Sequence, residues 1–426
     1  MKPIKHVLAL AIAASLLAAC GAPSDAPPPP PPAPDTVTGA EPGAAEPLGT
    51  VPAETAPAAP ETPQTGTATA TSDEPGHPFF ATTQVTAFDS PWAMTFLPDG
   101  RLLVTEMSGQ LHLLDPDSGA QGSISGTPEV AHAGQGGLAD IALHPGHADN
   151  GVIYLSFAEP GENGLAGGAV ARARLVLDDN GGGALEDLEV IWRQVPLSDD
   201  DGHYGLRLLF GDDGMLWISS SDRRQFDPAQ DMASNLGKIV RLNDDGSVPG
   251  DNPFADQNGV AAQVWSLGHR NILGMDFDAE GRLWAHEMGP KDGDELNLIV
   301  RGENYGYPLV SNGEHYDGTP IPDHDTRPEF AAPAVTWTPV ISPAGFIIYD
   351  GDLFPHWQGS GFIGGLSSMA LIRVEFDGEQ AREAERFDMG QRIREVEQGP
   401  DGSIWLLEDG TRQGNGRLYR LTPLEG

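Results

Sequence analysis

From Phe79 onward, the chain repeats a short apolar strand, a turn that carries Asp-Gly or a related pair, and a second apolar strand. Alternating apolar runs on both sides of such a turn are the strongest short-range signal for a β-hairpin. Clear copies of this unit begin at Met94, Leu208, Met275 and Val396. No long stretch has the spacing of apolar residues that an α-helix needs. The pattern therefore predicts an all-β domain.

The turn glycines recur at intervals of 51 to 70 residues, at Gly100, Gly151, Gly214, Gly281, Gly351 and Gly402. Each interval suits one four-stranded blade with long loops, and six such units predict a six-bladed β-propeller. We expect the first strand (79–88) and the last (416–422) to share one blade and so close the ring. Polar loops at the mouth of the central channel would then form one shared site.

The first twenty residues read as a targeting segment. Lys2 and Lys5 precede an apolar run, residues 7–17, which is too short to cross a membrane. The run ends in Leu-Ala-Ala-Cys20, which resembles the lipobox of bacterial lipoproteins. That resemblance implies a lipidated Cys20 and, because Gly21 follows it, an exported protein anchored to the outer membrane and facing the periplasm. An ordinary cleaved signal with an incidental cysteine is the alternative.

Residues 21–77 consist mainly of Pro, Ala, Thr, Gly and Glu, without an aromatic residue, Lys or Arg. Such a segment buries too little apolar surface to offset its ordering entropy, so we expect a disordered, partly polyproline tether. The propeller domain is expected to span residues 78–426.

Composition and motifs argue against several classes of function and site. The chain has 62 acidic against 24 basic residues and a formal net charge of −38, so it repels phosphate backbones and nucleic acid is a poor partner. Cys20 is the only cysteine, which excludes an intramolecular disulfide or a thiol site in the domain. No Gly-x-Gly-x-x-Gly segment opens a β–α–β unit, which argues against nicotinamide chemistry.

The stretch 267–297 gathers candidate chemistry on two polar loops joined by a hairpin. By residue type alone, Arg270 in the first loop is expected to form a salt bridge between neighbouring blades. In the same way, His203 reads as a surface histidine in a glycine-rich loop. Arg392 and Arg394 alternate along a strand, so both face one way, as on an exposed polar face.

Several short motifs, in order along residues 85–423, together resemble the glucose/sorbosone dehydrogenase family. They are Pro91-Trp-Ala-Met, Gly134-Gln-Gly-Gly-Leu-Ala-Asp-Ile-Ala-Leu-His-Pro, His203-Tyr-Gly-Leu-Arg, Ala229-Gln-Asp with Leu-Gly-Lys, Gly268-His-Arg-Asn, Glu287-Met-Gly-Pro with Gly-Asp-Glu-Leu-Asn, Asn304-Tyr-Gly-Tyr-Pro and Arg392-Ile-Arg. The resemblance implies a six-bladed propeller that uses pyrroloquinoline quinone (PQQ) and Ca²⁺. It also implies oxidation of aldoses or related polyols to lactones, with an external electron acceptor.

The resemblance also assigns catalytic roles. His203 is the expected general base, which takes the proton from the sugar C1 hydroxyl, and Asp222 is the acid that orients it. Arg270 and Asn271 are expected to contact the quinone oxygens, where a fixed positive charge stabilises developing negative charge. Gln135 is the expected substrate contact.

Cofactor and metal ligands follow from the same resemblance. Arg392 and Arg394 match arginines that bind cofactor carboxylates, a task that suits guanidinium groups. Gly289 and Pro290 match residues whose backbone carbonyls bind Ca²⁺, a hard ion that prefers oxygen. Three roles stay open for Glu295 and the neighbouring Asp294. They could bind the same calcium as carboxylate ligands, bind a second, structural calcium, or only cap the loop.

Two positions depart from the family pattern. Ser367 stands where the family usually has a lysine that binds the cofactor, and Met288 stands where His or Gln is common. Loss of one charge-assisted contact costs about 1.5–3 kcal/mol. Two alternatives therefore stay open: a metal-dependent, lactonase-like hydrolase, and a sugar-binding module without catalysis.

Overall fold

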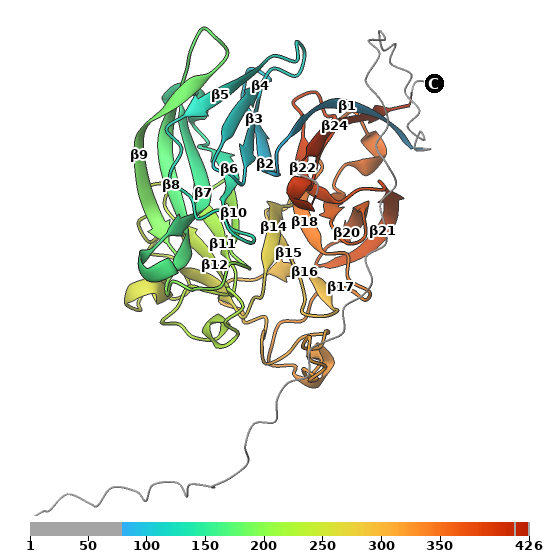
Figure 1. Cartoon of the computed structure of the whole chain (residues 1–426). Helices are drawn as coiled ribbons and strands as arrows, with labels where there is room; N and C mark the ends of the chain where they lie inside the picture. The colour runs from blue at the N-terminus through green and yellow to red at the C-terminus, as the bar shows by residue number, and fades with distance from the viewer. Residues whose placement is uncertain (1–78, 413–414, 425–426) are drawn as a thin grey trace, which may run out of the picture. The chain divides into compact units, whose positions relative to one another are not determined.

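The computed structural model describes residues 79–412 and 415–424 (Figure 1). The predicted signal segment with Cys20 and the predicted tether 21–77 lie outside the described residues. The described chain is built from strands, with one four-residue α-helix and short 3₁₀ helices. The all-β prediction is confirmed. No helix within the described ranges is long and apolar enough to cross a membrane.

Four of the sheets have four strands each. The sheet that joins both ends of the domain has the order β1 (Phe80–Phe88), β24 (Gly416–Pro423), β23 (Ile404–Glu408) and β22 (Ile393–Gln398). The other three follow chain order: β10 (Gly205–Phe210), β11 (Leu216–Ser220), β12 (Lys238–Leu242), β13 (Val264–Leu267); β14 (Ile272–Phe277), β15 (Leu283–Glu287), β16 (Asp294–Ile299), β17 (Val335–Trp337); and β18 (Pro343–Ile348), β19 (Gly361–Gly365), β20 (Ala370–Asp377), β21 (Gln380–Asp388).

The remaining sheet has eight strands in two antiparallel halves. One half is β2 (Pro91–Phe96), β3 (Leu102–Glu106), β4 (Leu111–Leu114) and β5 (Gln121–Ser125). The other is β6 (Leu138–Leu143), β7 (Val152–Pro160), β8 (Ala166–Leu177) and β9 (Gly183–Arg193). A short parallel pairing between β5 and β9 joins the halves.

The helices are short and lie in the connections between strands. They are α1 (His147–Asn150), η1 (Glu162–Gly164), η2 (Asp227–Ala229), η3 (Gly259–Gln263), η4 (His324–Thr326), η5 (Pro355–Trp357) and η6 (Gly410–Arg412). The sheets therefore form the framework of the domain, and the short helices only connect their strands.

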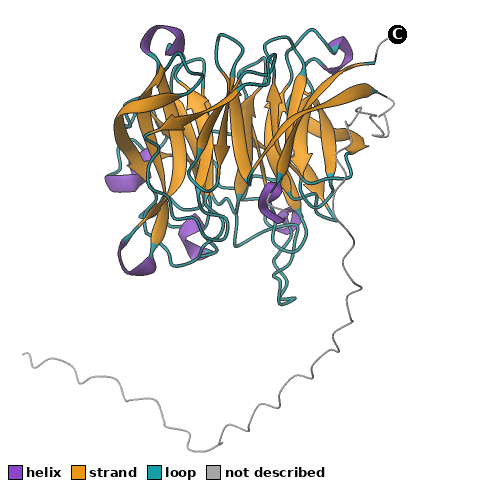
Figure 2. Cartoon of the chain, turned by 45° about the horizontal axis from the view of Figure 1, so that its top comes forward, coloured by secondary structure: helices purple, strands orange, loops and turns teal. Residues whose placement is uncertain are grey.

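The first strands of successive units contact one another in a closed order. β2 contacts β6, β6 contacts β10, and the series runs through β14, β18 and β22 back to β2. Figure 2 shows the strands standing side by side, with loops gathered at both ends. β1 pairs with β24 in antiparallel fashion, from Phe80 opposite Pro423 to Phe88 opposite Gly416. The predicted closure of the ring by the first and last strands is confirmed.

Five of the six predicted turn glycines have a positive φ, and the exception is Gly351. The connection from β18 to β19 is a longer loop in which Gly359 takes the left-handed conformation, with φ 74°. Phe354 and Trp357 stack their rings, with centroids 4.4 Å apart, and are buried under this loop. The chain therefore needs more residues here than a tight hairpin, and the prediction of a turn at Gly351 was wrong.

The core lies between neighbouring sheets. Tyr154 of β7 packs its ring edge-on against Phe210 of β10, with centroids 5.0 Å apart. Trp284 of β15 packs against Phe376 of β20 at 4.7 Å. Aromatic pairs at these separations add to the stability gained from burial. They fix the relative positions of the sheets, and so of the loops at their ends.

Charged side chains from several first strands line a cavity within the ring. A cavity of about 900 Å³ is lined by Asp140 of β6, Arg207 of β10, Asp276 of β14, and Glu395 and Glu397 of β22. Arg207 is 6% exposed, and its Nη1 donates to Glu395 Oε2 and lies 3.6 Å from Asp140 Oδ1. Arg207 is the only cationic residue among those that line this cavity.

The carboxyl groups around Arg207 hold their protons unusually tightly. Desolvation raises the pKa of Asp276 and that of Glu395 to about 7. Desolvation, and then repulsion from Glu395, raise the pKa of Glu397 well above its ordinary value. A raised carboxyl pKa means that ionisation costs stability as the pH rises. Arg207 offsets part of that cost.

Candidate functional site

The predicted site residues come from loops at one end of the ring. Gln135, His203 and Arg270 precede the first strands β6, β10 and β14, whereas Asp222 and Gly289 follow the second strands β11 and β15. Because the first and second strands of each unit are antiparallel, the start of one and the end of the other lie at the same edge. The fold therefore brings together side chains that are far apart in the sequence.

His203 and Asp222 form a buried pair. His203 Nδ1 lies 2.7 Å from Asp222 Oδ1, and the two residues are 7% and 0% exposed. A carboxylate at Nδ1 favours the tautomer in which Nδ1 carries the hydrogen and Nε2 is free to accept a proton. The main-chain N–H of His203 also donates to Gln135 Oε1 at 2.8 Å, which links the predicted base to the predicted substrate contact.

His203 combines a lowered imidazole pKa with an uncommon backbone conformation. Burial lowers the pKa of its imidazole, against the opposing effect of Asp222, so the ring is neutral at neutral pH. Its φ of 46° is in the left-handed region, which is uncommon for a residue with a side chain. The N–H of Asp222 donates to the carbonyl of Arg270 at 2.8 Å. This bond ties Asp222 to the loop that carries Arg270.

Arg270 lies in the same cavity as His203 and Asp222, a space of about 940 Å³. Its main-chain N–H donates to Glu287 Oε2 at 2.5 Å. Its guanidinium donates to the carbonyls of Met288, at 2.8 Å, and Gly289. The guanidinium carbon lies 5.9 Å from the centre of the Tyr307 ring. A cation is thus held on the wall of the cavity that His203 also lines.

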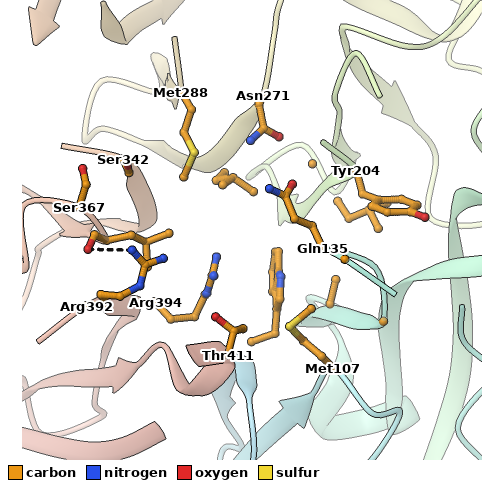
Figure 3. Close-up of a pocket in the computed structure, with 18 of the residues that line it drawn as sticks. Met107, Gln135, Tyr204, Asn271, Met288, Ser342, Ser367, Arg392, Arg394 and Thr411 are labelled. Carbon is orange, nitrogen blue, oxygen red and sulfur yellow. Dashed lines mark hydrogen bonds between the residues drawn. The ribbon is translucent and has the colours of Figure 1, made fainter. Parts of the chain in front are cut away.

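A second cavity of about 480 Å³ shares Gln135, Met288, Tyr316 and Ser342 with the first. Asn271 and Gln135 lie on one side of it, and Arg392, Arg394 and Thr411 on the other (Figure 3). Trp92 also lines it, and the guanidinium carbon of Arg207 lies 4.2 Å from the centre of the Trp92 ring. The Trp92 ring thus connects the candidate site with the charged centre of the ring.

Arg392 and Arg394 share one buried carboxylate. Arg392 Nε donates to Asp409 Oδ2 at 2.7 Å and Arg394 Nη2 to Asp409 Oδ1 at 3.0 Å. Thr411 Oγ1 also donates to Asp409 at 2.8 Å. The two arginines hold the pKa of Asp409 below its ordinary range, although burial opposes them. One negative charge faces two cations, so the wall keeps a net positive charge that suits an anionic ligand.

The predicted calcium residues also lie close together. Gly289, Pro290 and Glu295 line a small cavity of about 10 Å³ with Arg270 and Glu287. However, Glu295 already binds His324 at 3.2 Å and Asn297 at 3.3 Å, and lines neither larger cavity. The described residues contain no group of three or more His, Cys, Asp or Glu that could hold a metal ion.

Asp294 caps the loop, one of the three roles that the sequence left open. Asp294 Oδ1 accepts from the N–H of Gly289 at 2.9 Å. Asp294 Oδ2 accepts from the N–H groups of Ile341 and Ser342, at 2.9 and 2.7 Å. Burial raises the pKa of this carboxyl to about 6. Its hydrogen bonds tie the 288–290 loop to the next unit.

Both departures from the family pattern face the site. Ser367 lines the cavity beside Arg392, and its Oγ donates to the Val340 carbonyl at 3.3 Å. Met288 lines both cavities. The structure thus places a short hydroxyl group near the arginines, where the family usually has a lysine.

Sequence reasoning missed Asp409 and Tyr307. Asp409 stands in an Asp-Gly pair that reads as one more hairpin turn, and only the packing of Arg392 and Arg394 shows its role. Tyr307 was noticed only as part of a motif, yet its hydroxyl is buried in the cavity wall. The available signal for Asp409 is its place directly after the strand that pairs with the arginine strand β22.

A family model matches most of the chain. Residues 88–420 match the model described as "Glucose / Sorbosone dehydrogenase". Among curated proteins, the chain is 38% identical over 343 residues to "Aldose sugar dehydrogenase YliI" of Escherichia coli (strain K12). That alignment covers 79% of this chain and 90% of that protein.

Solved structures agree with this match. The apo form of the soluble aldose sugar dehydrogenase from Escherichia coli aligns with a TM-score of 0.75 and 37% identity, over 81% of this chain and 99% of that one. The PQQ-bound form of aldose sugar dehydrogenase from Streptomyces coelicolor aligns with a TM-score of 0.67 and 28% identity, over 80% and 98%.

Proposed function

Because the chain belongs to the glucose/sorbosone dehydrogenase family, we propose that it is a PQQ-dependent oxidoreductase that converts aldose sugars, or related polyols, to lactones. The observation that carries the proposal is the His203–Asp222 pair, 2.7 Å apart, in the same cavity as the Arg270 guanidinium. We also infer six blades, since the eight-stranded sheet divides into two four-stranded halves.

The polar groups of the site fit a cofactor that carries carboxylates and quinone oxygens. Arg270 Nε, Asn271 Oδ1 and Arg394 Nε are buried and have no hydrogen-bond partner among the described residues. Buried polar atoms are normally paired, so a ligand that pairs with these three would be stabilised. Arg270, Asn271, Arg392 and Arg394 would hold the cofactor, and PQQ, when bound, supplies a quinone that accepts a hydride.

The chain's own residues then divide the remaining work. His203 Nε2 accepts the proton of the C1 hydroxyl, and Asp222 stabilises the imidazolium that forms. Gln135, bonded to the His203 backbone, orients the sugar beside the base. The buried positive charge of Arg270 favours negative charge at a neighbouring oxygen.

Calcium belongs to the same proposal. The carbonyls of Gly289 and Pro290 would supply two of its oxygen ligands, and the others would come from the cofactor. In this structure the Gly289 carbonyl accepts a hydrogen bond from Arg270.

The direct test uses the full chain with PQQ, CaCl₂, a panel of aldoses and an electron-accepting dye. We expect dye reduction that requires both the sugar and PQQ. Absence of any PQQ-induced change in absorbance or melting temperature at saturating cofactor would overturn the proposal. Metal-dependent hydrolysis of a lactone without dye reduction would favour the hydrolase instead. Sugar binding without turnover would favour the binding module.

Ser367→Lys should strengthen PQQ binding. A cation at this position would give the cofactor a further charge-assisted contact, so we expect the Kd for PQQ to fall about tenfold or more. A fluorescence titration of the purified chain measures it. Ser367→Met, which adds length without charge, is the matched control. An unchanged Kd for Ser367→Lys would show that position 367 lies outside the reach of the cofactor's charged groups.

We also propose that the protein is exported and held at the outer membrane, facing the periplasm, through a lipid on Cys20. This rests on the lipobox resemblance of residues 17–20. Metabolic labelling with a fatty acid tests it: label on the wild type but not on Cys20→Ser is expected. Label on neither would contradict the anchor. The electron acceptor would then lie outside the cytoplasm.

A further inference from the structure

The mouth of the His203 cavity carries exposed aromatic side chains. Across the described residues, the aromatic side chains that are largely exposed are Phe79 (54%), Phe226 (44%) and Tyr316 (76%). Phe226 and Tyr316 both line the cavity that holds His203 and Arg270. Single exposed apolar residues are ordinary, whereas two exposed rings that line one cavity are a candidate contact surface for a ligand.

Phe226 is held in place by a strained backbone. Its φ and ψ are 59° and −82°, and the N–H of Asp227 donates to the carbonyl of Gln225 at 2.9 Å. These values describe a γ-turn of the rare kind, which costs free energy and which glycine adopts more easily than phenylalanine. The ring packs against Tyr307, with centroids 6.3 Å apart, yet stays 44% exposed. The strained backbone thus holds a partly exposed ring at the cavity.

A second loop completes the rim. It lies between β16 and β17, in the orange segment that stands away from the sheets in Figure 1. His315 places its ring edge-on to Phe226, with centroids 5.6 Å apart. A turn links the N–H of His315 to the carbonyl of Thr319 at 3.0 Å, and presents Tyr316 at its tip. The N–H of Lys291 donates to the carbonyl of Glu314 at 3.0 Å. This hydrogen bond ties the loop to the one that contains Pro290.

Polar groups stand beside the rings. Asp317, Thr319 and Arg224 line the same cavity as Phe226 and Tyr316. A pyranose ring has this combination of surfaces, with C–H groups on its faces and hydroxyls around its edge. Aromatic faces bind the C–H groups, and carboxylate, hydroxyl and guanidinium groups bind the hydroxyls. The rim thus has the chemistry of a sugar subsite outside the catalytic residues.

We propose that Phe226, His315 and Tyr316 form an outer subsite, called here the aromatic rim, which binds the second pyranose unit of a reducing disaccharide. The proposal rests on the proposed function, in which the first unit presents its C1 hydroxyl to His203. The aromatic rim then selects reducing disaccharides and longer oligosaccharides over monosaccharides of the same reducing unit.

The test measures binding and turnover separately. Calorimetry on the PQQ-loaded full chain compares methyl maltoside with methyl glucoside, whose blocked C1 hydroxyl cannot be oxidised. Steady-state kinetics compare maltose with glucose. In Phe226→Gly, which removes the ring and relieves the strain, and in Tyr316→Ser, we expect methyl maltoside to bind about five- to tenfold more weakly. The affinity for methyl glucoside and the kcat/KM for glucose should change much less.

Leu309→Ala is the control, because Leu309 is 46% exposed in the same segment and lines neither cavity of the site. Equal losses for methyl maltoside and methyl glucoside would overturn the aromatic rim, as would no loss for either. A change confined to the KM of the dye would assign the rings to the electron acceptor and also overturn it. If the wild type oxidises neither glucose nor maltose, the proposed function fails, while the calorimetric affinities still decide the subsite.

Discussion

Replacing His203 with alanine is expected to lower kcat for aldose oxidation by about 10²–10⁴-fold, the range that a general base contributes. The His203 imidazole lines the cavity and is bound through Nδ1 to the buried Asp222 carboxylate, and in the proposed mechanism its Nε2 takes the sugar proton. Affinity for PQQ should stay near that of the wild type, because the proposed cofactor contacts are on Arg270, Asn271, Arg392 and Arg394. Dye-reduction kinetics at saturating PQQ, with a separate PQQ titration, measure both quantities.

The pH dependence gives an independent check on the same residue. Burial lowers the pKa of His203, so the imidazole is protonated and inactive only at acidic pH. We expect kcat/KM to rise with pH through a value below the ordinary histidine pKa of about 6.5 and then to reach a plateau. His356→Ala, at an exposed histidine in η5, should leave the profile unchanged. A His203→Ala variant with more than a tenth of wild-type kcat would contradict the assignment of the base.

Arg207→Met is expected to destabilise the domain by about 3–5 kcal/mol, the usual cost of removing one partner from a buried ion pair. The variant keeps a side chain of similar length over Trp92 but leaves Glu395 and Asp140 without their cation. Chemical unfolding followed by tryptophan fluorescence measures the loss. Arg174→Met, which removes the exposed pair with Glu186, is the matched control and should cost about 1 kcal/mol or less.

The loss in Arg207→Met should also depend on pH. The pKa of Glu395 is about 7 with Arg207 present and rises when the cation is removed. The folded state therefore binds protons more tightly than the unfolded chain, and stability falls as the pH rises above the ordinary carboxyl pKa. Destabilisation should be smaller at pH 5 than at pH 8. An equal loss at both values would show that ionisation of these carboxyls does not contribute.

The strands and the place of the site could be predicted from the sequence because their causes are local. Asp-Gly or a related pair between apolar runs forms the turn at five of the six predicted positions, and His203 and Arg270 stand in loops beside first strands. The prediction at Gly351 failed because Phe354 and Trp357, further along, demand a longer loop. Asp409 was missed for the opposite reason: its local sequence is a turn, and its partners come from another strand. The contact of Asp409 with Arg394 depends on how β22 pairs with β23, and a turn pattern does not specify that register.

Closure of the ring imposes an order on folding. β1 is among the first described residues to be synthesised, but its pairing partner β24 is among the last. Until β24 exists, β1 has only open backbone groups on that side, and such an edge invites pairing with other chains. Contacts between distant parts of a chain also form slowly. A chain that stops before β24 therefore cannot close the ring. It keeps an exposed strand edge, and this edge distinguishes an incomplete chain from the folded domain.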